Sequence, residues 1–436
     1  MLKNLICLFA AASMSGAAFA RLDKPIEPIE IPPSIQQGVD LIYVDPEIAP
    51  EVRERERLLG EIGLNDSPGA AIDLLVPVHP IFTELRRGLM LYRANWSGLP
   101  QLPIPPGPGL RPGEAGERVA LLRKRLGLKS GERYDAQLVK AVRRYQQAHG
   151  LEADGIAGST TLDSLNLGAA HYERLVEINL ERARRLPASS DKGRYILVDA
   201  GAARIYMYED GRLKDSMKAI VGKAASPTPM MAAKIRYASV NPYWNVPTDL
   251  VQKLVAPRVI ADGAAYLDAK RYQLLSDWTE QARILDSAEV DWRAISEGRA
   301  ELRVRQLPGQ DNSMGDIKFM MPNDFGIYLH DTPDKALFEL DDRWISNGCV
   351  RVEDARRLAE WLFGHMPKGS DPNAEEEVPL SSPVPVYITY LTVGTSADGL
   401  VFRHDPYSRD GAVVARHLAA EAAREAGGIG ASASGQ

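Results

Sequence analysis

The sequence of 436 residues lacks three features that would assign it to a broad class at once. It has no excess of positive charge: the formal net charge is −6, which gives no electrostatic reason to expect a nucleic-acid partner. It has no apolar run of the about 20 residues that a membrane-spanning helix needs. It has only two cysteines, Cys7 and Cys349, so no disulfide framework holds it together. A chain of this length can bury a core without one.

The first twenty residues have the pattern of a secretory signal peptide. A lysine near the start, a short apolar run over residues 5–12 and the small residues of Ala18-Phe19-Ala20 follow in the order that signal peptidase requires. We expect cleavage after Ala20, no membrane span in the mature protein, and a periplasmic location. Cys7 leaves with the signal. Cys349 is then the single thiol of the mature protein in an oxidising compartment. Such a thiol is either buried and inert or takes part in chemistry.

The helical half of the chain comes first. Residues 21–106 predict a linker and a helical scaffold region, with helices over 52–64 and 80–96. A proline-rich stretch from Leu99 to Pro112 forms a stiff connection. Residues 107–168 predict a module of three short helices. Asp135 and Ser159 are expected to cap the second and third helices, and Gly150 to close the second.

The period of the apolar residues changes to two after a further helix over 170–185. Strands are expected from 194 to 245, with Asp210-Gly211 as a two-residue hairpin turn. Helical spacing returns over about 250–306, which predicts a helical insertion. Strands resume at 317–321 and 326–330, followed by a helix over 353–363 and a last strand over 386–393. Residues 169–410 therefore predict a mostly-β domain, and residues 411–436 a tail. The predicted fold class is α+β multidomain.

Two short segments carry the residues with the clearest chemistry. One contains Tyr328, His330 and Asp331, and the other is Ser346-Asn347-Gly348-Cys349-Val350-Arg351. A thiol with a pKa of about 8.5 needs a base, and an imidazole with a pKa of about 6.5 supplies one. Spacing alone does not distinguish such a pair from chance neighbours.

The surroundings of the cysteine add to this prediction. Gly348 permits unusual backbone torsions beside a nucleophile, and the N–H groups of Gly348 and Cys349 are candidates to hold an oxyanion. One cysteine and one histidine cannot fill a zinc site. We therefore expect neither a metal nor a cofactor.

Together the two segments resemble the signature of the YkuD-type L,D-transpeptidases, a His followed by Ser-His-Gly-Cys and an Arg two residues on. Asn347 stands where most members carry His, which puts any contact of that imidazole in doubt. The segment from Asn241 to Pro247 and the run from Leu307 to Phe319 resemble the larger, YcbB-like members. Residues 107–168 resemble a three-helix peptidoglycan-binding domain, although a spacer bundle also fits them. The residues that carry this second resemblance are Leu110-Arg111-Pro112-Gly113, Gly116, Val119, Leu122, Ala141-Val142, Tyr145-Gln146, Gly150-Leu151, Asp154-Gly155, Gly158 and Thr160.

The resemblance implies acyl transfer in cell-wall biogenesis. Cys349 would attack the carbonyl of the third residue of a tetrapeptide stem and release D-alanine, and a second stem would accept the acyl group in a 3–3 cross-link. His330 would move the proton, oriented by the carbonyl of Asp331. Carbapenems would acylate the same thiol. The partners would be peptidoglycan stem peptides and glycan, with other cell-wall enzymes a further expectation.

The resemblance also implies which residues line the substrate. They are Tyr328, Trp244, Ser346, Asn347 and Arg351. Packing in a β-core explains Tyr328 and Trp244 nearly as well. Pairing with Asp354 or Glu353 is the alternative for Arg351, but a substrate carboxylate is favoured, because arginine binds a carboxylate with two bonds. The insertion would act as a lid against water. Two alternatives stay open: a non-catalytic scaffold and an L,D-carboxypeptidase. A papain-like peptidase is disfavoured, because it places Cys before His.

Overall fold

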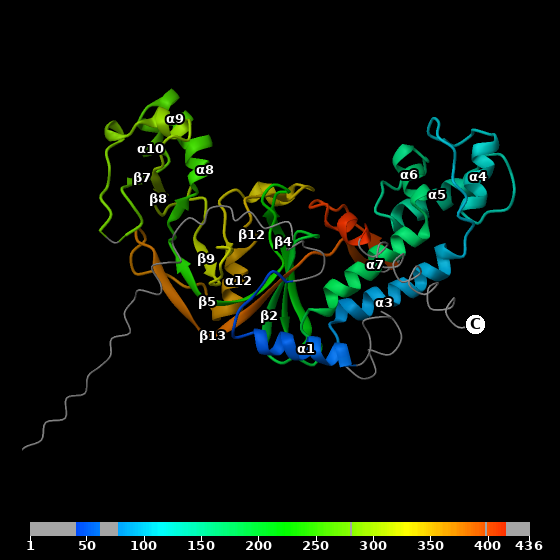
Figure 1. The fold of residues 1–436 in the computed structure, drawn as a ribbon, viewed down its shortest axis with the longest axis horizontal. Coiled ribbons are helices and arrows are strands. Elements are labelled where there is room, and N and C mark those ends of the chain that lie inside the picture. The colour runs from blue at the N-terminus through cyan, green and yellow to red at the C-terminus, as the bar shows by residue number, and fades with distance from the viewer. Residues whose placement is uncertain (1–40, 62–76, 280, 397–398, 416–436) are drawn as a thin grey trace, which may run out of the picture.

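The computed structural model describes residues 41–61, 77–279, 281–396 and 399–415. The predicted signal peptide and the chain after residue 415 lie outside this part. None of the helices in the described part combines the length and the apolar character needed to cross a bilayer. Figure 1 shows a central β-structure between two smaller bodies, the three-helix module at one end and the insertion at the other.

A ten-stranded sheet forms the centre of the molecule. Its order is β1-β5-β13-β2-β3-β4-β12-β10-β9, with β11 beside β4. Strand β9 pairs with β5 as well as with β10, so the sheet closes on itself as a barrel. The strands of this sheet are β1 (Tyr43–Val44), β2 (Arg194–Asp199), β3 (Arg204–Glu209), β4 (Arg212–Gly222), β5 (Met231–Val240), β9 (Ile317–Met320), β10 (Leu329–His330), β11 (Trp344–Ser346), β12 (Val350–Val352) and β13 (Glu376–Thr389).

Alternation along the strands separates an inner from an outer face of the barrel. On β2, Ile196 and Val198 belong to the interior core, whereas Tyr195 and Leu197 belong to a second core outside it, as the period of a strand requires. The predicted Asp210-Gly211 hairpin joins β3 to β4, with φ of 50° and 71° at its two residues, as a type I′ turn needs. Helix α12 (Ala355–Phe363) joins the interior core.

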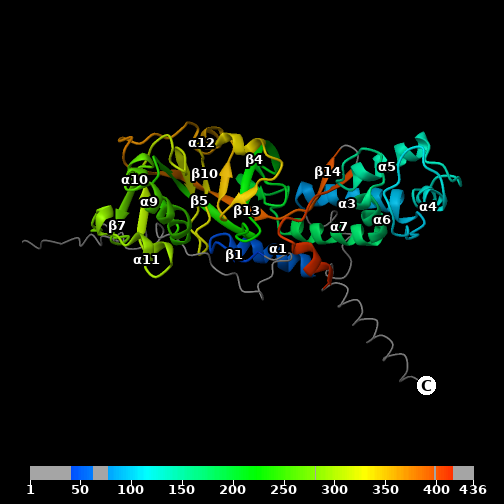
Figure 2. The same cartoon turned by 90° about the horizontal axis from the view of Figure 1, so that it is seen from above.

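Three long helices cover the outer face beside β2 and β3. They are α1 (Ala49–Glu61), α3 (Pro80–Tyr92) and α7 (Ala169–Arg184). In Figures 1 and 2, α3 and α7 lie side by side and lead from the barrel to the three-helix module. Their apolar faces meet the outer residues of the sheet and the hairpin of β14 (Val393–Ser396) and β15 (Gly399–Phe402). The helix predicted over 80–96 continues after α3 as the π-helical segment η2 (Arg93–Ser97).

The three-helix module has the predicted form. Its helices are α4 (Glu117–Arg125), α5 (Ala136–Ala148) and α6 (Ser159–Leu167). Asp135 caps α5 by accepting the Leu138 N–H at 2.9 Å, as expected. The predicted cap at Ser159 is wrong: Gly158 is the N-cap of α6, without a side-chain hydrogen bond, and Ser159 begins the helix. After α5, Gly150 lies at φ +68°, so close to the Phe402 carbonyl that no side chain fits there.

The insertion differs from the prediction of a purely helical segment. Its centre is an antiparallel sheet in the order β6-β8-β7, surrounded by short helices and with a core of its own. Its elements are β6 (Trp244–Val246), α8 (Thr248–Leu250), η3 (Val251–Val255), α9 (Ala256–Asp262), α10 (Ala265–Ala269), β7 (Tyr272–Leu275), η4 (Ser287–Glu289), α11 (Trp292–Ser296) and β8 (Arg303–Gln306). Strands of three or four residues are too short to show a period of two. Of the last predicted strand, 386–393, residues 386–389 are the end of the much longer β13, and Val393 begins β14.

Candidate active site

The two segments singled out in the sequence lie on neighbouring strands. Strands β10 and β12 run parallel, with Leu329 opposite Val350 and His330 opposite Arg351. Leu329 and Val350 point into the barrel core, so the residues that alternate with them face outward. Cys349, one residue before β12, comes beside Tyr328, because the Val350 N–H donates to the Tyr328 carbonyl at 3.1 Å. His330 and Cys349 therefore share the outer face of two adjacent strands, which run about 4.8 Å apart.

His330 is held as a neutral base. Its side chain is only 2% exposed, and its Nδ1–H donates to the Asp331 carbonyl at 2.6 Å. A carbonyl only accepts, so the proton is on Nδ1 and the lone pair is on Nε2. Burial, together with the nearby positive charge of Arg351, lowers the pKa of His330 to about 3. The imidazole is consequently neutral throughout the physiological range.

Cys349 is a partly exposed free thiol. Its Sγ–H donates weakly to the Gly326 carbonyl at 3.6 Å. Burial raises the pKa of the Cys349 thiol, against hydrogen bonds from Tyr328 and the positive charges of Arg351 and Lys318. The resting pair is thus a thiol and a neutral imidazole, and the thiol depends on a base for activation.

Hydrogen bonds fix the loop before the cysteine. Gly348 has φ +118°, a conformation that favours glycine. Its N–H donates to Ser346 Oγ at 3.2 Å, and the Ser346 hydroxyl donates to the Cys349 carbonyl at 2.6 Å. The Gly348 carbonyl in turn accepts from Thr228 Oγ1 at 2.7 Å. Thr228, fully buried on the segment after β4, was not foreseen, because only the fold brings it here.

This loop changes two expectations. The Gly348 N–H is engaged, so it is not a free oxyanion donor; the Cys349 N–H has no acceptor among the residues described here. Ser346 was expected to line the substrate, but it is only 4% exposed, and its hydroxyl forms hydrogen bonds within the loop. Asn347, between them, is exposed to solvent.

Arg351 is available for an anionic ligand. Its alternative partners are occupied elsewhere, since Glu353 accepts the Lys218 N–H at 2.8 Å and Asp354 accepts the Arg357 N–H at 2.9 Å. The Arg351 Nε is buried and makes no hydrogen bond with any residue that the structure describes. A buried guanidinium nitrogen without an acceptor is costly, and the negative charge of Asp334, which acts on Arg351, forms no ion pair with it among the described residues.

Of the two aromatic residues expected to line the site, Tyr328 lies there and Trp244 does not. Tyr328 lies at the site, partly exposed, with its ring 5.6 Å from that of His330 in a T-shaped arrangement. Trp244 packs instead against the core of the insertion, 6.4 Å from the Tyr272 ring. The explanation by packing therefore describes Trp244 better than Tyr328.

Lys318 is a further charged residue at the site. On β9 it lies opposite His330, and its Nζ is 5.9 Å from the centre of the Tyr328 ring. It is 6% exposed and forms an ion pair of 2.8 Å with Glu375. His330 is thus flanked by Lys318 on one strand and Arg351 on the other. Nothing in the local sequence marked Lys318 for this role, because its neighbours here come from strand pairing.

Comparisons with known proteins identify two domain families along the chain. Residues 193–388 match the family model YkuD, described as the L,D-transpeptidase catalytic domain, and residues 118–165 match the model PG_binding_1, described as "Putative peptidoglycan binding domain". A protein of Haemophilus influenzae named "Putative L,D-transpeptidase" is 32% identical over 240 residues, which cover 53% of this chain and 47% of that protein. The chain thus spans about half the length of this curated relative.

Solved structures of L,D-transpeptidases are also similar to the chain. One from Xylanimonas cellulosilytica is 17% identical, with 65% of this chain and 99% of that one covered and a TM-score of 0.20. One from Mycobacterium smegmatis is 12% identical, with 45% and 58% covered and a TM-score of 0.22. TM-scores this low carry no structural argument. The family models are what confirm the two resemblances found in the sequence.

Proposed function

We propose that this chain, which carries a YkuD-type L,D-transpeptidase catalytic domain behind a peptidoglycan-binding domain, is a peptidoglycan L,D-transpeptidase with Cys349 as its nucleophile. The observation that supports the proposal is the register of β10 and β12, by which the partly exposed Cys349 and the neutral His330, with its lone pair on Nε2, share the outer face of neighbouring strands. The proposed place of action is the cell wall outside the cytoplasm, where its substrate lies.

Acylation begins when His330 Nε2 takes the proton of the Cys349 thiol. The sulfur attacks the carbonyl carbon of the third residue of a tetrapeptide stem, and the Cys349 N–H stabilises the developing oxyanion. The intermediate collapses, the bond to D-alanine breaks, and the imidazolium returns its proton to the departing amine. A thioester on Cys349 remains.

Transfer reverses these roles. The side-chain amine of a second stem attacks the thioester carbonyl, Nε2 takes the proton of that amine, and the sulfur leaves and recovers the proton as a thiol. The product is a 3–3 cross-link. Arg351 is suited to hold a substrate carboxylate through its unengaged Nε. Tyr328 and Asn347 are the further residues that we propose to contact the substrate. The insertion remains a proposed lid, which would favour transfer over hydrolysis.

Incubation of the full chain with purified disaccharide-tetrapeptide, followed by mass analysis of the products, tests the proposal. A dimer lacking one D-alanine is expected, and it should be absent with Cys349→Ala. Accumulation of the tripeptide without dimer would assign an L,D-carboxypeptidase. Unchanged substrate, together with no covalent imipenem adduct on Cys349, would identify a non-catalytic scaffold instead.

A further inference from the structure

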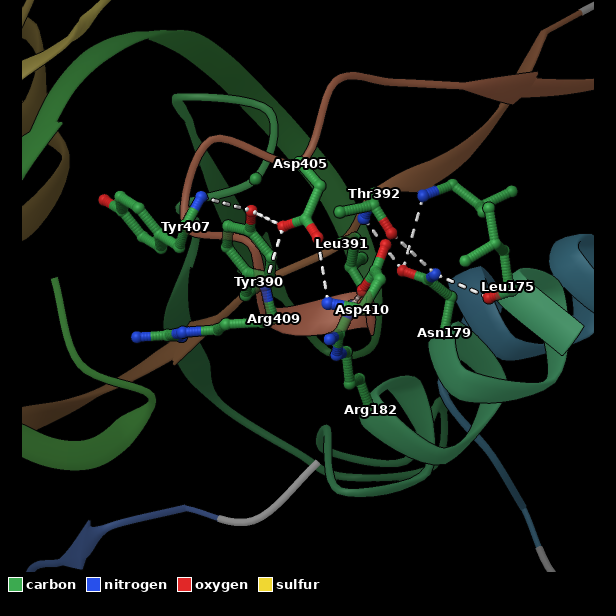
Figure 3. Close-up of polar contacts among 12 residues, drawn as sticks. Leu175, Asn179, Arg182, Tyr390, Leu391, Thr392, Asp405, Tyr407, Arg409 and Asp410 are labelled. Carbon is green, nitrogen blue, oxygen red and sulfur yellow. Dashed lines mark hydrogen bonds and ion pairs between the residues drawn. The ribbon is translucent and has the colours of Figure 1, made fainter. Parts of the chain in front are cut away.

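The segment Asp405–Asp410, which we call the C-terminal clamp, folds back onto the barrel (Figure 3). The Asp405 carboxylate accepts hydrogen bonds from the Tyr390 hydroxyl, from the Arg409 N–H at 3.1 Å and from the Asp410 N–H at 2.8 Å. The Tyr407 N–H donates to the Tyr390 hydroxyl at 3.1 Å, and the two tyrosine rings stack with centres 4.9 Å apart. One carboxylate and one aromatic stack thus fix the whole turn.

A buried ion pair attaches the clamp to α7. Asp410 Oδ1 lies 2.8 Å from a guanidinium nitrogen of Arg182, whose side chain is completely buried. The Arg182 guanidinium also lies 5.2 Å from the centre of the Tyr390 ring. One helical turn earlier, Asn179 Oδ1 accepts the Thr392 N–H at 2.9 Å. The clamp is therefore anchored in the helical layer, as Figure 3 shows.

At its other end the clamp reaches the segment that holds the nucleophile loop. The Tyr407 hydroxyl donates to the Gly222 carbonyl at 2.7 Å and accepts the Thr228 N–H at 3.4 Å. Arg409 donates to the Thr228 carbonyl at 3.4 Å. Both backbone groups of Thr228 are thus held by the clamp. Its hydroxyl accepts the Gly222 N–H at 2.8 Å and donates to the Gly348 carbonyl.

We propose that Tyr407 and Arg409 are positioning residues for the acyl transfer, an inference that rests on the proposed function. They fix Thr228, and Thr228 fixes the Gly348–Cys349 peptide from its carbonyl side. With the Gly348 N–H and the Cys349 carbonyl already held by Ser346, this leaves the Cys349 N–H and thiol as the groups of the loop aimed at a substrate. Neither clamp residue needs to touch the substrate.

Removal of single hydroxyls separates this role from general packing. Tyr407→Phe keeps the ring stacked on Tyr390 and loses only the hydrogen bonds to Gly222 and Thr228. Thr228→Val keeps the shape and loses both bonds of the hydroxyl, whereas Thr228→Ser keeps them. Tyr92→Phe is the matched control, because it loses a buried hydroxyl bond, 3.1 Å to His149, in the helical layer.

Two measurements on the full chain read out the effect. The first is the rate of imipenem acylation of Cys349 against imipenem concentration, followed by intact mass. We expect the maximal rate to fall about tenfold or more in Tyr407→Phe and Thr228→Val, with the half-saturating concentration unchanged and near-normal rates in Thr228→Ser and Tyr92→Phe. The second is amide hydrogen exchange of the peptide around 346–350, which should quicken in the same two variants and not in Tyr92→Phe.

Wild-type maximal rates in Tyr407→Phe, or a loss matched by Tyr92→Phe, would overturn the inference. Should Thr228→Val not fold, Tyr407→Phe decides alone. If the wild-type chain takes no imipenem and also leaves disaccharide-tetrapeptide unchanged, the proposed function fails, and the hydrogen exchange of the loop still decides whether the clamp positions it.

Discussion

At the scale of single residues, burial and two neighbouring cations keep the histidine neutral. Lys318 and Arg351 lie on the strands at either side of His330, and both lower its pKa. An imidazolium between them would be repelled and poorly solvated. A neutral base beside a protonated thiol follows, rather than a preformed thiolate–imidazolium pair. In the proposed mechanism, His330 therefore has to take the thiol proton during the reaction itself and cannot hold it beforehand.

Arg351 provides a prediction at the same scale. Arg351→Lys keeps the positive charge but loses the planar fork that binds a carboxylate with two bonds. We expect the KM for a tetrapeptide stem to rise about tenfold, equivalent to about 1.4 kcal/mol. Alkylation of Cys349 by neutral iodoacetamide, which has no carboxylate to bind, should stay within about twofold. An unchanged KM would show that Arg351 does not hold the substrate.

At the scale of elements, local signals determined what the sequence could predict. The Asp210-Gly211 turn and the Asp135 cap needed only neighbouring residues, and both formed as expected. His330 and Cys349 were visible because a motif marks them. Thr228 was not visible, since loop packing between distant segments brings it to the site. Lys318 lay in the run from Leu307 to Phe319 that carries the resemblance, but only strand pairing places it beside His330. The insertion was misread because its strands are too short for a periodic pattern.

The nucleophile loop makes a prediction about its own glycine. Gly348 and Gly364, the C-cap of α12, both have positive φ, and a Cβ would clash with nothing at either position. Alanine at either should cost about 1–2 kcal/mol of unfolding free energy through backbone strain. Only Gly348→Ala should also lower the acylation rate, because its peptide orients the Cys349 N–H. Denaturant unfolding and imipenem acylation of both variants provide the measurements, and equal acylation rates would contradict the account.

At the scale of the whole molecule, segments from both ends of the described part of the chain pack on the central barrel and its helices. Strand β1 pairs with β5, the clamp joins α7 to the barrel, and β15 meets the end of α5. The binding module and the β-domain are consequently linked through packed helices and not by a flexible tether. The proline-rich composition of residues 99–112 predicted a stiff connection. It could not predict the packing of the helices, because the packed residues lie far apart in the sequence.

Buried histidines make the whole fold acid-sensitive. Burial lowers the pKa of His79 and His330 to about 3 and that of His149 to about 4. In the unfolded chain a histidine has a pKa of about 6.5, so below this pH the unfolded chain binds protons that the folded chain does not. The free energy of unfolding therefore decreases as the pH falls from about 6.5 to about 4. We expect a loss on the order of 1–2 kcal/mol per histidine at pH 5.

Denaturant unfolding at pH 7.5 and pH 5 measures this loss. His149→Gln should show a smaller difference between the two pH values than the wild-type chain, and exposed His404→Gln should show the same difference. An unfolding free energy that does not change between these pH values would show that the pKa values of the buried histidines are not lowered.

The central claim is that one imidazole and one thiol on adjacent strands perform acyl transfer. Its most direct measurement is the mass of the chain after brief incubation with disaccharide-tetrapeptide and an acid quench, with the modified peptide mapped. The account predicts a disaccharide-tripeptide acyl group on Cys349, absent in Cys349→Ala and formed about a hundredfold more slowly in His330→Gln. An acyl group on another residue, or wild-type acylation in His330→Gln, would contradict it.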